Sequence, residues 1–287
     1  MNTPQDLLHH FLFENTPIRG NIAKLDQTYI DALQHQSMPP VLAKALGELM
    51  TASALLISTL KMEGALILQL QSKGILKLLV VECNSDLDLR ATAKWSGDIA
   101  QQSFIDLIED GQFVITLDPK IGEAYQGIVP LEGDTIATML ENYMLRSQQI
   151  DTSIWLHCDG ENAAGLLLQK LPNQGEHDAD TWHRVNTLAN TVTPLELKTL
   201  SPEVLLQRLF HEEDVRLFNA RPIKAFCSCT RDSVVNMLKM LGKAEVDSII
   251  EEQGSIQVNC DFCNKHYVFD ELESTQLFDE QTDTIKH

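Results

Sequence analysis

The stretch CSCTRDSVVNMLKMLGKAEVDSIIEEQGSIQVNCDFC, residues 227–263, decides how the end of this chain folds. It begins with the pair Cys227 and Cys229 and ends with the pair Cys260 and Cys263. Two close cysteine pairs separated by an ordered insert suit a tetrahedral zinc site, in which four thiolates lie ~2.3 Å from the metal. We therefore expect these four cysteines to bind one zinc ion per chain. His266 lies nearby, but four thiolates already complete a closed site.

The insert between the two pairs has the pattern of two helices and a strand. Residues 232–241 and 245–253 predict helices that each end at a glycine, and residues 255–259 predict a strand. Residues 266–269 would return beside that strand, which places the second cysteine pair at the tip of a hairpin. The region 225–287 is too small to be stable through its own core. Because zinc contributes on the order of 10–16 kcal/mol to folding such domains, we expect bound zinc to stabilise the fold of this region.

Most zinc ions held by four cysteines are purely structural, and that interpretation stays open here. Residues one apart on an extended chain point to opposite sides, so Cys227 and Cys229 share a metal only if the chain turns between them. The turn also lets these sulfurs form a strained local disulfide, and strained disulfides are the labile ones. Zinc keeps its ligands as thiolates, which oxidants attack. An oxidant would eject the metal and remove its stabilising effect on the fold. The second interpretation is therefore that the site is a redox switch.

Charge and composition limit what the protein can bind. The chain of 287 residues is 44% hydrophobic, enough for a substantial core, and its formal net charge is −19. The region 225–287 has 5 Lys and Arg against 12 Asp and Glu, a net charge of −7. Such a chain repels phosphate backbones, because nucleic-acid affinity comes mainly from cations. It also repels anionic membrane surfaces, so we expect neither nucleic acid nor a membrane as a partner.

Two segments bear on the cellular compartment. Residues 1–13 contain no basic leader and no long apolar run, so they do not resemble a secretory signal. The most apolar stretch, 41–60, is interrupted by Lys44 and Glu48, which favours a buried helix over a membrane span. We expect a cytoplasmic protein, in a reducing compartment where stable disulfides are uncommon. The six cysteines of the chain therefore need another explanation.

The first part of the chain, residues 1–172, has the pattern of an α+β domain, because its strands cluster rather than alternate with helices. We expect a helical start, then a long helix that begins at Pro39 and Pro40. The apolar runs 65–71 and 75–83 predict a hairpin. Further elements are expected as strands at 89–95, 112–117, 125–129, 153–158 and 165–171, and as a helix at 135–149 with Asp134 as its N-cap.

Residues 173–224 have the pattern of a linker built from short helices between prolines. Ser201 and Pro202 make a good helix start, since proline is favoured at the first helical position. Isolated helices of this length are marginal in water, so they must dock on a neighbour. We expect a metastable helical linker followed by a C-terminal zinc domain at 225–287. Apolar linker residues that could contact partner proteins are Leu195, Leu197, Leu205, Leu209 and Phe210.

Other chemistry-bearing residues give weaker signals. Cys83 and Cys158 lie in apolar strand-like runs and are expected to be small buried residues. His211 is expected to be a solvated residue at a helix end. The sequence contains no glycine-rich phosphate loop, no nucleophile elbow and no metalloprotease helix. We therefore expect no catalytic residues and no enzyme.

At the two cysteine pairs of residues 227–263, the chain resembles the heat-shock protein 33 family of redox-regulated chaperones. The resemblance rests on the two cysteine pairs and their separation, followed by Tyr267. It extends almost over the whole chain in the same order, through the motifs YQGIV at 125–129, LEGD at 131–134, RS at 146–147 and LFHEE at 209–213.

The resemblance implies an ATP-independent holdase that acts in the stress response and protein refolding. It implies an inactive form that is reduced and zinc-bound, and an active form, usually a homodimer, that binds unfolded or misfolded client proteins. Oxidation in such proteins pairs Cys227 with Cys229 and Cys260 with Cys263, releases zinc and unfolds the C-terminal domain. The linker then loosens and exposes apolar surface. The family's N-terminal domain is a mixed sheet with covering helices.

Two other functions are weighed against the holdase. A zinc-dependent nucleic-acid binder is opposed by the charge of the C-terminal region, and salt-dependent binding to random duplex would revive it. A thiol–disulfide oxidoreductase is suggested by the Cys-X-X-Cys and Cys-X-Cys spacings. In the sequence, however, the pair at 260–263 lies in a hairpin-like segment rather than at a helix start after a strand. Catalytic reduction of insulin disulfides would favour this alternative.

Overall fold

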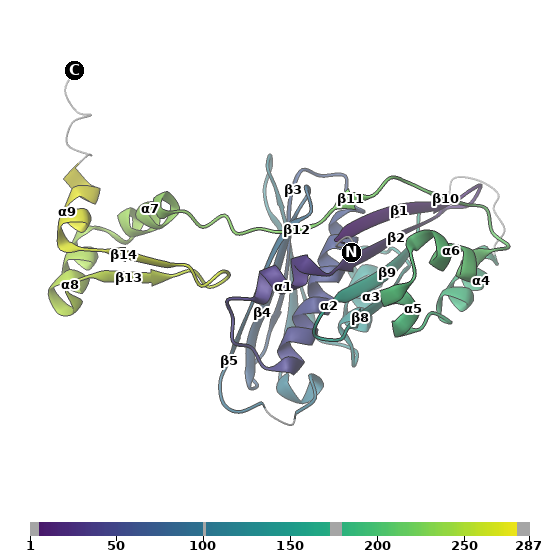
Figure 1. Ribbon diagram of the computed structural model, residues 1–287, viewed down its shortest axis with the longest axis horizontal. Helices are drawn as coiled ribbons and strands as arrows, with labels where there is room; N and C mark the ends of the chain where they lie inside the picture. Colours follow the sequence, from purple (N-terminus) through teal and green to yellow (C-terminus); the bar gives the residue numbers. More distant parts are fainter. Residues whose placement is uncertain (1–5, 100–101, 173–179, 280–287) are drawn as a thin grey trace, which may run out of the picture. The chain divides into compact units, whose positions relative to one another are not determined.

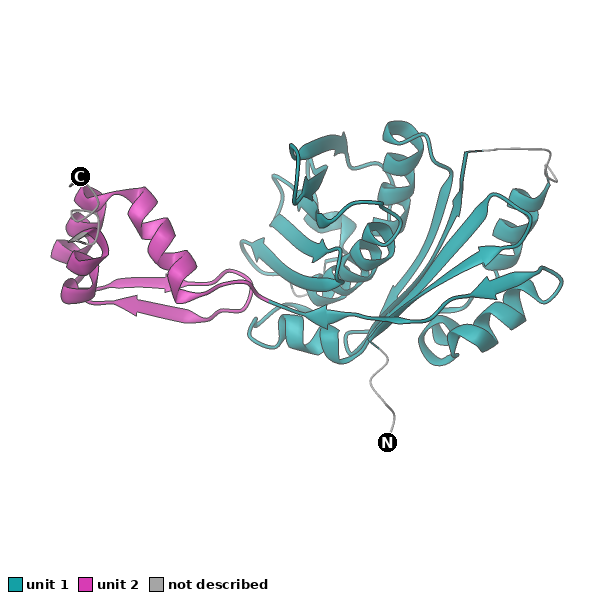
Figure 2. Ribbon diagram, turned by 90° about the horizontal axis from the view of Figure 1, so that it is seen from above, with its two compact units in different colours: residues 1–226 teal, residues 227–287 magenta. Residues whose placement is uncertain are grey.

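The computed structural model describes residues 6–99, 102–172 and 180–279. The chain divides into two compact units, residues 1–226 and 227–287, which are coloured separately in Figure 2. The first unit contains two six-stranded sheets, and the second contains a two-stranded sheet.

The first sheet of the larger unit has the strand order β10-β1-β2-β9-β8, with β11 paired to β1 (Figure 1). Every strand pair in this sheet is antiparallel. Its strands are β1 (Leu7–Phe13), β2 (Ile18–Leu25), β8 (Thr152–Cys158), β9 (Ala163–Lys170), β10 (Val215–Leu217) and β11 (Arg221–Pro222).

The second sheet has the strand order β12-β5-β4-β3-β6-β7. Its pairs are antiparallel except that of β12 with β5, which is parallel, so this sheet is mixed. Its strands are β3 (Gly64–Gln71), β4 (Leu76–Asn84), β5 (Asp88–Trp95), β6 (Gln112–Pro119), β7 (Tyr125–Pro130) and β12 (Lys224–Ala225). The expected hairpin is confirmed as β3 and β4, whose register pairs Ala65 with Asn84.

Helix α2 (Pro40–Ile57) packs against strands of both sheets and forms the centre of the main core. It is buried on almost every face, as expected for a helix that is apolar all round. It is long and apolar enough to cross a membrane, but most of it is buried inside the protein, so it is a core helix. The expected long buried helix is thus confirmed. The other helical elements before the linker are α1 (Gln27–Leu33), the 3₁₀ turn η1 (Ile105–Leu107) and α3 (Ile136–Ser147).

Two expectations for this unit are wrong. The helical start is instead the pair of strands β1 and β2, because β1 is held between β2 and the distant strand β10, a pairing that no local pattern reveals. The N-cap of α3 is Thr135 rather than Asp134. The Thr135 hydroxyl accepts a hydrogen bond from the backbone N–H of Thr138 at 3.1 Å, which satisfies an otherwise unpaired donor.

The helices of the expected linker cover the face of the first sheet that α2 leaves free. They are α4 (Thr181–Ala189), α5 (Pro194–Thr199) and α6 (Pro202–Phe210). Their apolar side chains join those of β1, β2 and β9 in a second core. Residues of β9 are consequently buried on both faces of the sheet. Ser201 caps α6 and Pro202 is its first residue, which confirms the expected helix start.

The second unit is small and has a small core. Its elements are α7 (Arg231–Leu241), α8 (Lys243–Gln253), β13 (Ile256–Asn259), β14 (His266–Phe269) and α9 (Glu271–Asp279). Helix α7 ends at Gly242 and α8 at Gly254, both with positive φ, and β13 and β14 form an antiparallel hairpin, as expected. Helix α9 was not expected. Among the described residues of this unit, the buried apolar ones are Val234, Leu238, Val246, Ile256, Tyr267 and Phe269.

Candidate metal centre

Four cysteine sulfurs of the second unit converge on one point. The Sγ atoms of Cys227, Cys229, Cys260 and Cys263 all lie within 4.8 Å of one another. The Sγ–Sγ distance is 3.6 Å between Cys227 and Cys260 and 3.3 Å between Cys229 and Cys263. A tetrahedron with metal–sulfur bonds of ~2.3 Å has edges of about 3.8 Å, so the cluster has the dimensions of a four-thiolate metal site. The four cysteines could therefore hold a metal ion.

The first cysteine pair is positioned by the start of α7. Thr230 follows Cys229 and is the N-cap, with its side chain accepting from the N–H of Ser233 while the Ser233 hydroxyl accepts from the N–H of Thr230. This capping box fixes where the extended chain ends and the helix begins. As a result, Cys227 and Cys229 lie just before a fixed point of the backbone.

The second pair lies in a tight turn between β13 and β14. The N–H of Cys260 donates to the carbonyl of Lys265 at 3.0 Å, and the N–H of Asn264 donates to the carbonyl of Cys260 at 2.9 Å. Asn264 has φ of 54°, a left-handed conformation that asparagine tolerates and that lets the chain reverse here. Both sulfurs are thus held at the tip of a hairpin.

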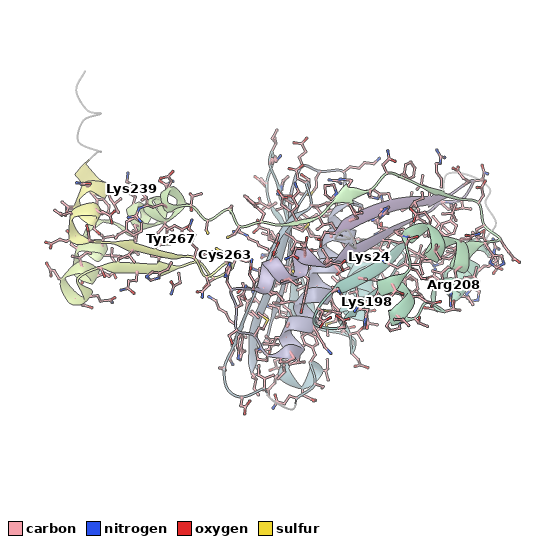
Figure 3. The ribbon with its side chains drawn as sticks, in the orientation of Figure 1. Lys24, Lys198, Arg208, Lys239, Cys263 and Tyr267 are labelled. Carbon is pink, nitrogen blue, oxygen red and sulfur yellow. The ribbon has the colours of Figure 1, made fainter. Side chains whose placement is uncertain are left out.

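Tyr267 links the two halves of the site. Its ring is buried in the small core, and its hydroxyl donates to the carbonyl of Cys229 at 3.0 Å and lies 3.4 Å from the Cys229 sulfur. Figure 3 labels Tyr267 and Cys263 in this unit. The cluster of potential metal ligands consists of the four cysteines and does not include His266, whose Nδ1 is hydrogen-bonded to the side-chain oxygen of Asn259.

The thiols of the cluster differ in acidity. Burial alone would raise the pKa of Cys229, but hydrogen bonds from the Tyr267 hydroxyl and from the neighbouring thiols lower it to about 7. Burial, together with hydrogen bonds to the other cysteines, raises the pKa of Cys263 to about 12. The thiol of Cys229 therefore loses its proton readily near neutral pH, whereas the thiol of Cys263 keeps its proton. A divalent cation among the sulfurs is what allows all four to be thiolates at neutral pH.

The other two cysteines are buried in the first unit, as expected. Cys83 is completely buried, and burial raises its pKa to about 12. Cys158 is 5% exposed, and burial also raises its pKa. A buried thiol with a raised pKa carries little thiolate, so both are unreactive structural residues. His211 is an exposed helix-end residue, also as expected.

Four of the five apolar linker residues singled out in the sequence are buried. Leu197, Leu205, Leu209 and Phe210 pack in the core between the linker helices and the first sheet, where the Phe210 ring meets the Phe13 ring edge-on at 4.9 Å. Leu195 is 69% exposed. In this structure the four buried residues pack against the first sheet, so the five residues form no continuous exposed apolar surface.

A buried lysine holds one of the linker helices and was not anticipated. Lys24 lies on β2 and is 4% exposed, and its ammonium donates to the carbonyl of Lys198 at 2.9 Å and to that of Leu200 at 2.5 Å. These carbonyls belong to the C-terminal end of α5, where helices leave acceptors unsatisfied. Lys198 is itself paired with Asp159 from the turn before β9. Lys24, Lys198 and Arg208 are labelled in Figure 3.

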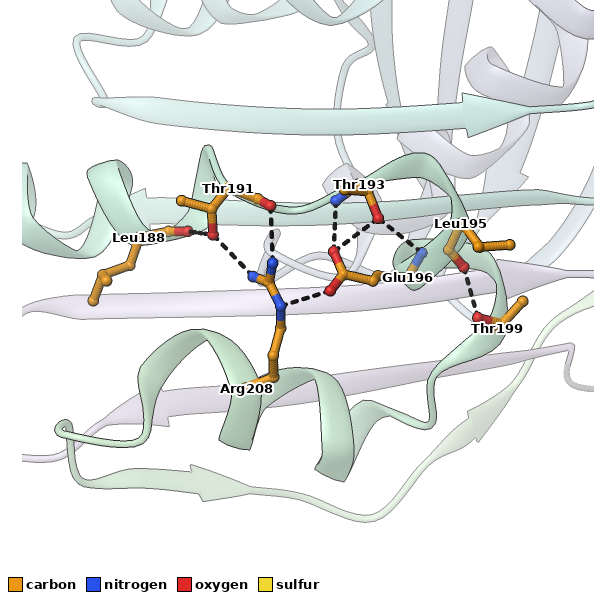
Figure 4. Close-up of polar contacts among 7 residues, drawn as sticks. All are labelled: Leu188, Thr191, Thr193, Leu195, Glu196, Thr199 and Arg208. Atoms are coloured by element: carbon orange, nitrogen blue, oxygen red, sulfur yellow. Dashed lines mark hydrogen bonds and ion pairs between the residues drawn. The ribbon is translucent and has the colours of Figure 1, made fainter.

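Arg208 ties α6 to α5. Its guanidinium pairs with the Glu196 carboxylate at 2.6 Å and donates to the hydroxyl and carbonyl oxygens of Thr191, at 2.8 and 3.1 Å. Glu196 also accepts hydrogen bonds from Thr193, whose hydroxyl in turn accepts from the N–H of Glu196 (Figure 4). The linker is thus fastened by polar contacts as well as by its apolar face.

The whole chain is similar to proteins of one family. It matches the family model described as Hsp33 protein over residues 6–270. It is 58% identical over 276 residues to the 33 kDa chaperonin of Methylobacillus flagellatus, which covers 95% of this chain and 94% of that protein. It is 48% identical over 277 residues to the 33 kDa chaperonin of Chromobacterium violaceum, covering 96% of this chain and 94% of that protein.

The fold is also similar to that of a solved structure. The crystal structure of the 33 kDa chaperonin of Thermotoga maritima superposes with a TM-score of 0.83, covering 97% of this chain and 99% of that one at 21% sequence identity. At this identity the likeness concerns the fold. It confirms the expected α+β class, with N-terminal sheets and helices followed by a small C-terminal region that carries the cysteine cluster.

Proposed function

The chain belongs to the Hsp33 protein family, and we propose that it is a redox-regulated, ATP-independent holdase that is inactive when reduced and zinc-bound. In its oxidised, zinc-free form it would bind unfolded client proteins as a homodimer in the cytoplasm. Because the family is one of chaperones, the protein would act by binding and unfolding and not by turnover.

The observation that carries this proposal is the cluster of four sulfurs in a unit with a very small core. Zinc is the metal that suits four thiolates in a closed tetrahedral site, and when bound it would supply folding free energy on the order of 10 kcal/mol. That amount is comparable to the stability of an entire small domain. A unit with six buried core residues (Val234, Leu238, Val246, Ile256, Tyr267 and Phe269) therefore has little to hold it once the thiolates are lost.

The thiolates lose their ligand capacity when they become disulfides. Each pair of thiolates gives two electrons to one hydrogen peroxide and forms one S–S bond, and two protons complete the conversion of the peroxide to two waters. Two peroxides thus consume all four thiolates of the cluster. Oxidants react with thiolates, and with zinc bound all four sulfurs of the cluster would be thiolates, so each is open to attack.

The pairing of the disulfides determines whether the unit unfolds. Cross-pairs between Cys227 and Cys260 and between Cys229 and Cys263 would tie the segment before α7 to the hairpin and preserve the native arrangement. Local pairs, Cys227 with Cys229 and Cys260 with Cys263, leave these two parts unconnected. Since all four sulfurs lie within 4.8 Å of one another, either pairing is within reach. We propose the local pairs, as in the family, because only they release the unit.

Unfolding of the second unit would then loosen the linker at 173–224. The chain runs from α6 to Cys227 through β10, β11 and β12, which contain three, two and two residues. Such short strands have few ladder hydrogen bonds and fray easily. Undocking of α5 and α6 would expose Leu197, Leu205, Leu209 and Phe210 beside Leu195. Burial of this surface against an unfolded client yields about 25 cal/mol per Å².

The proposal is tested by light scattering of a chemically unfolded client that is diluted into buffer. Peroxide-treated protein should suppress aggregation, reduced protein should not, and treatment of the oxidised protein with a thiol reductant and zinc should abolish the suppression. Equal suppression by both forms would exclude the redox gate. The same preparations should neither reduce insulin disulfides with turnover nor bind random duplex, because either activity would favour one of the alternative functions.

A further inference from the structure

A cavity of about 180 Å³ opens beside the C-terminal end of α2 in the first unit. It lies between α2, α3 and strands of both sheets. Its walls are mainly apolar and are made by Leu56, Leu60, Leu66, Ile115, Leu117 and Met144. None of these residues belongs to the cysteine cluster or to the linker helices. The cavity is therefore separate from the proposed chaperone mechanism.

The charged groups at this cavity are all cationic. Arg19 and Lys61 line it, and no aspartate or glutamate of the described residues does. This is unusual in a chain with 41 acidic and 22 basic residues, whose lysines and arginines have many possible carboxylate partners. In the part of the chain that the structure describes, Arg19 pairs with no carboxylate. A half-buried cation without a counter-ion is a binding group for an anion.

Arg19 is held in place by a neutral residue. Its Nε and Nη2 donate to the side-chain oxygen of Gln169 at 3.1 and 2.7 Å. Gln169 is completely buried, and its amide nitrogen donates to the hydroxyl of Thr152 at 3.2 Å, which fixes its oxygen toward Arg19. Of the five N–H donors of a guanidinium, three remain for a ligand. The arginine is thus oriented before any ligand arrives.

A buried hydroxyl adds a second donor. Tyr143 is 4% exposed and lines the cavity, and its oxygen accepts a hydrogen bond from the side chain of Gln148 at 3.1 Å. That contact uses a lone pair and leaves the hydroxyl proton of Tyr143 to be donated. This proton can therefore be donated to a ligand in the cavity. Both donors suit a carboxylate.

We propose that this cavity binds a small monocarboxylic acid with an apolar tail. The carboxylate would accept from Arg19 and Tyr143, and the tail would lie against the leucine, isoleucine and methionine side chains of the wall. A dry apolar cavity of roughly 150 Å³ accommodates a benzene ring, so the site suits an acid with about six carbons. A few convergent polar groups in an apolar pocket are the usual composition of a small-molecule site.

The test uses hexanoate and its uncharged isostere hexanamide with the reduced, full-length, zinc-loaded protein. Titrations followed by methyl NMR should show saturable shifts at Ile115, Leu117 and Met144 with hexanoate at millimolar concentrations. Hexanamide should bind about ten- to one-hundredfold more weakly, because it lacks the charge that strengthens the contact with Arg19. Arg19→Gln should weaken hexanoate binding by a similar factor, and Arg19→Lys should restore part of it.

Two further variants keep the result interpretable. Tyr143→Phe keeps the ring and should weaken hexanoate binding severalfold. Arg216→Gln removes an exposed arginine that pairs with Glu14 away from the cavity and should leave binding unchanged. Equal affinity for hexanoate and hexanamide, unchanged binding in folded Arg19→Gln, or shifts located away from the cavity would each overturn the assignment.

Discussion

The hydroxyl of Tyr267 donates a hydrogen bond to the backbone carbonyl of Cys229 at a distance of 3.0 Å, and the same hydroxyl lies 3.4 Å from the Cys229 sulfur. The tyrosine ring is one of the few buried side chains of the second unit. One residue therefore belongs both to the small core and to the surroundings of the sulfur cluster. Loss of the core and loss of the cluster should accompany each other.

Tyr267→Phe tests this link, because it keeps the ring and removes the hydroxyl. Hydrogen-bond partners of metal ligands typically contribute ten- to hundredfold to metal affinity, so we expect zinc affinity to fall by about tenfold. Competition with a coloured chelator measures the change. Tyr125→Phe, an exposed tyrosine of β7, is the matched control and should keep the original affinity. Unchanged affinity in Tyr267→Phe would remove the tyrosine from the site.

The disulfide pairing is tested by peptide mapping after peroxide treatment. We expect Cys227 joined to Cys229 and Cys260 joined to Cys263, since local pairs free the hairpin from the preceding segment. The structure offers a direct contrast, because it places the sulfurs of Cys227 and Cys260 3.6 Å apart and those of Cys229 and Cys263 3.3 Å apart. If mass spectrometry finds these cross-pairs in the active form, oxidation would link the segment before α7 covalently to the hairpin. Unfolding of the second unit would then not explain the activation.

Lys24→Met should weaken the docking of α5 without any oxidant. The ammonium makes two charge-assisted hydrogen bonds to the carbonyls of Lys198 and Leu200, and their loss should cost on the order of 2–4 kcal/mol. We expect the reduced variant to be cleaved faster by protease between α4 and α6 and to suppress aggregation partially. The control is Lys77→Met, which removes an exposed lysine that donates to the carbonyl of Lys73. Identical cleavage of the two variants would show that Lys24 does not fasten the linker.

Glu48 should make the stability of the first unit depend on pH. Burial raises its pKa from 4.5 to about 7, against the opposing effect of Lys44. Because the folded-state pKa lies above the unfolded one, the folded protein binds more protons between these values. The stabilisation is complete below pH 4.5 and is lost as pH rises through 7, by about 3 kcal/mol in total.

Denaturant unfolding at pH 5.5 and pH 8, followed by tryptophan fluorescence, measures this dependence. The three tryptophans, Trp95, Trp155 and Trp182, all lie in the first unit, so the signal does not report on the second unit. Glu48→Gln should be more stable than the original protein at pH 8 and should show a smaller difference between the two pH values. An equal pH dependence in both proteins would show that Glu48 titrates normally.

Local signals were sufficient for much of the fold and for the sulfur site. Helix α2, the β3–β4 hairpin and the start of α6 at Ser201 are encoded in apolar periodicity, turn residues and a cap. The cysteine cluster was predictable because each pair is local and thiolate chemistry is restrictive.

Long-range contacts could not be predicted in this way. The start of the chain is expected to be helical, but its residues form strand β1 because they pair with distant segments. One of these is β10, where Leu217 pairs with Phe11. The buried role of Lys24 was equally hidden, since lysine is almost always exposed and only the packed linker shows which carbonyls it meets. The cap at Thr135 was misplaced by one residue because Asp134 and Thr135 have similar capping propensity, and only the backbone geometry distinguishes them.

The most direct test of the central claim counts zinc and free thiols before and after peroxide treatment while far-UV circular dichroism is recorded. If the thiolates hold a metal on which the second unit depends, each chain should release one zinc, consume four thiols and lose part of its helix, from α7, α8 and α9. A reduced protein that contains no metal, or a helical signal that persists after the zinc has left, would contradict the account.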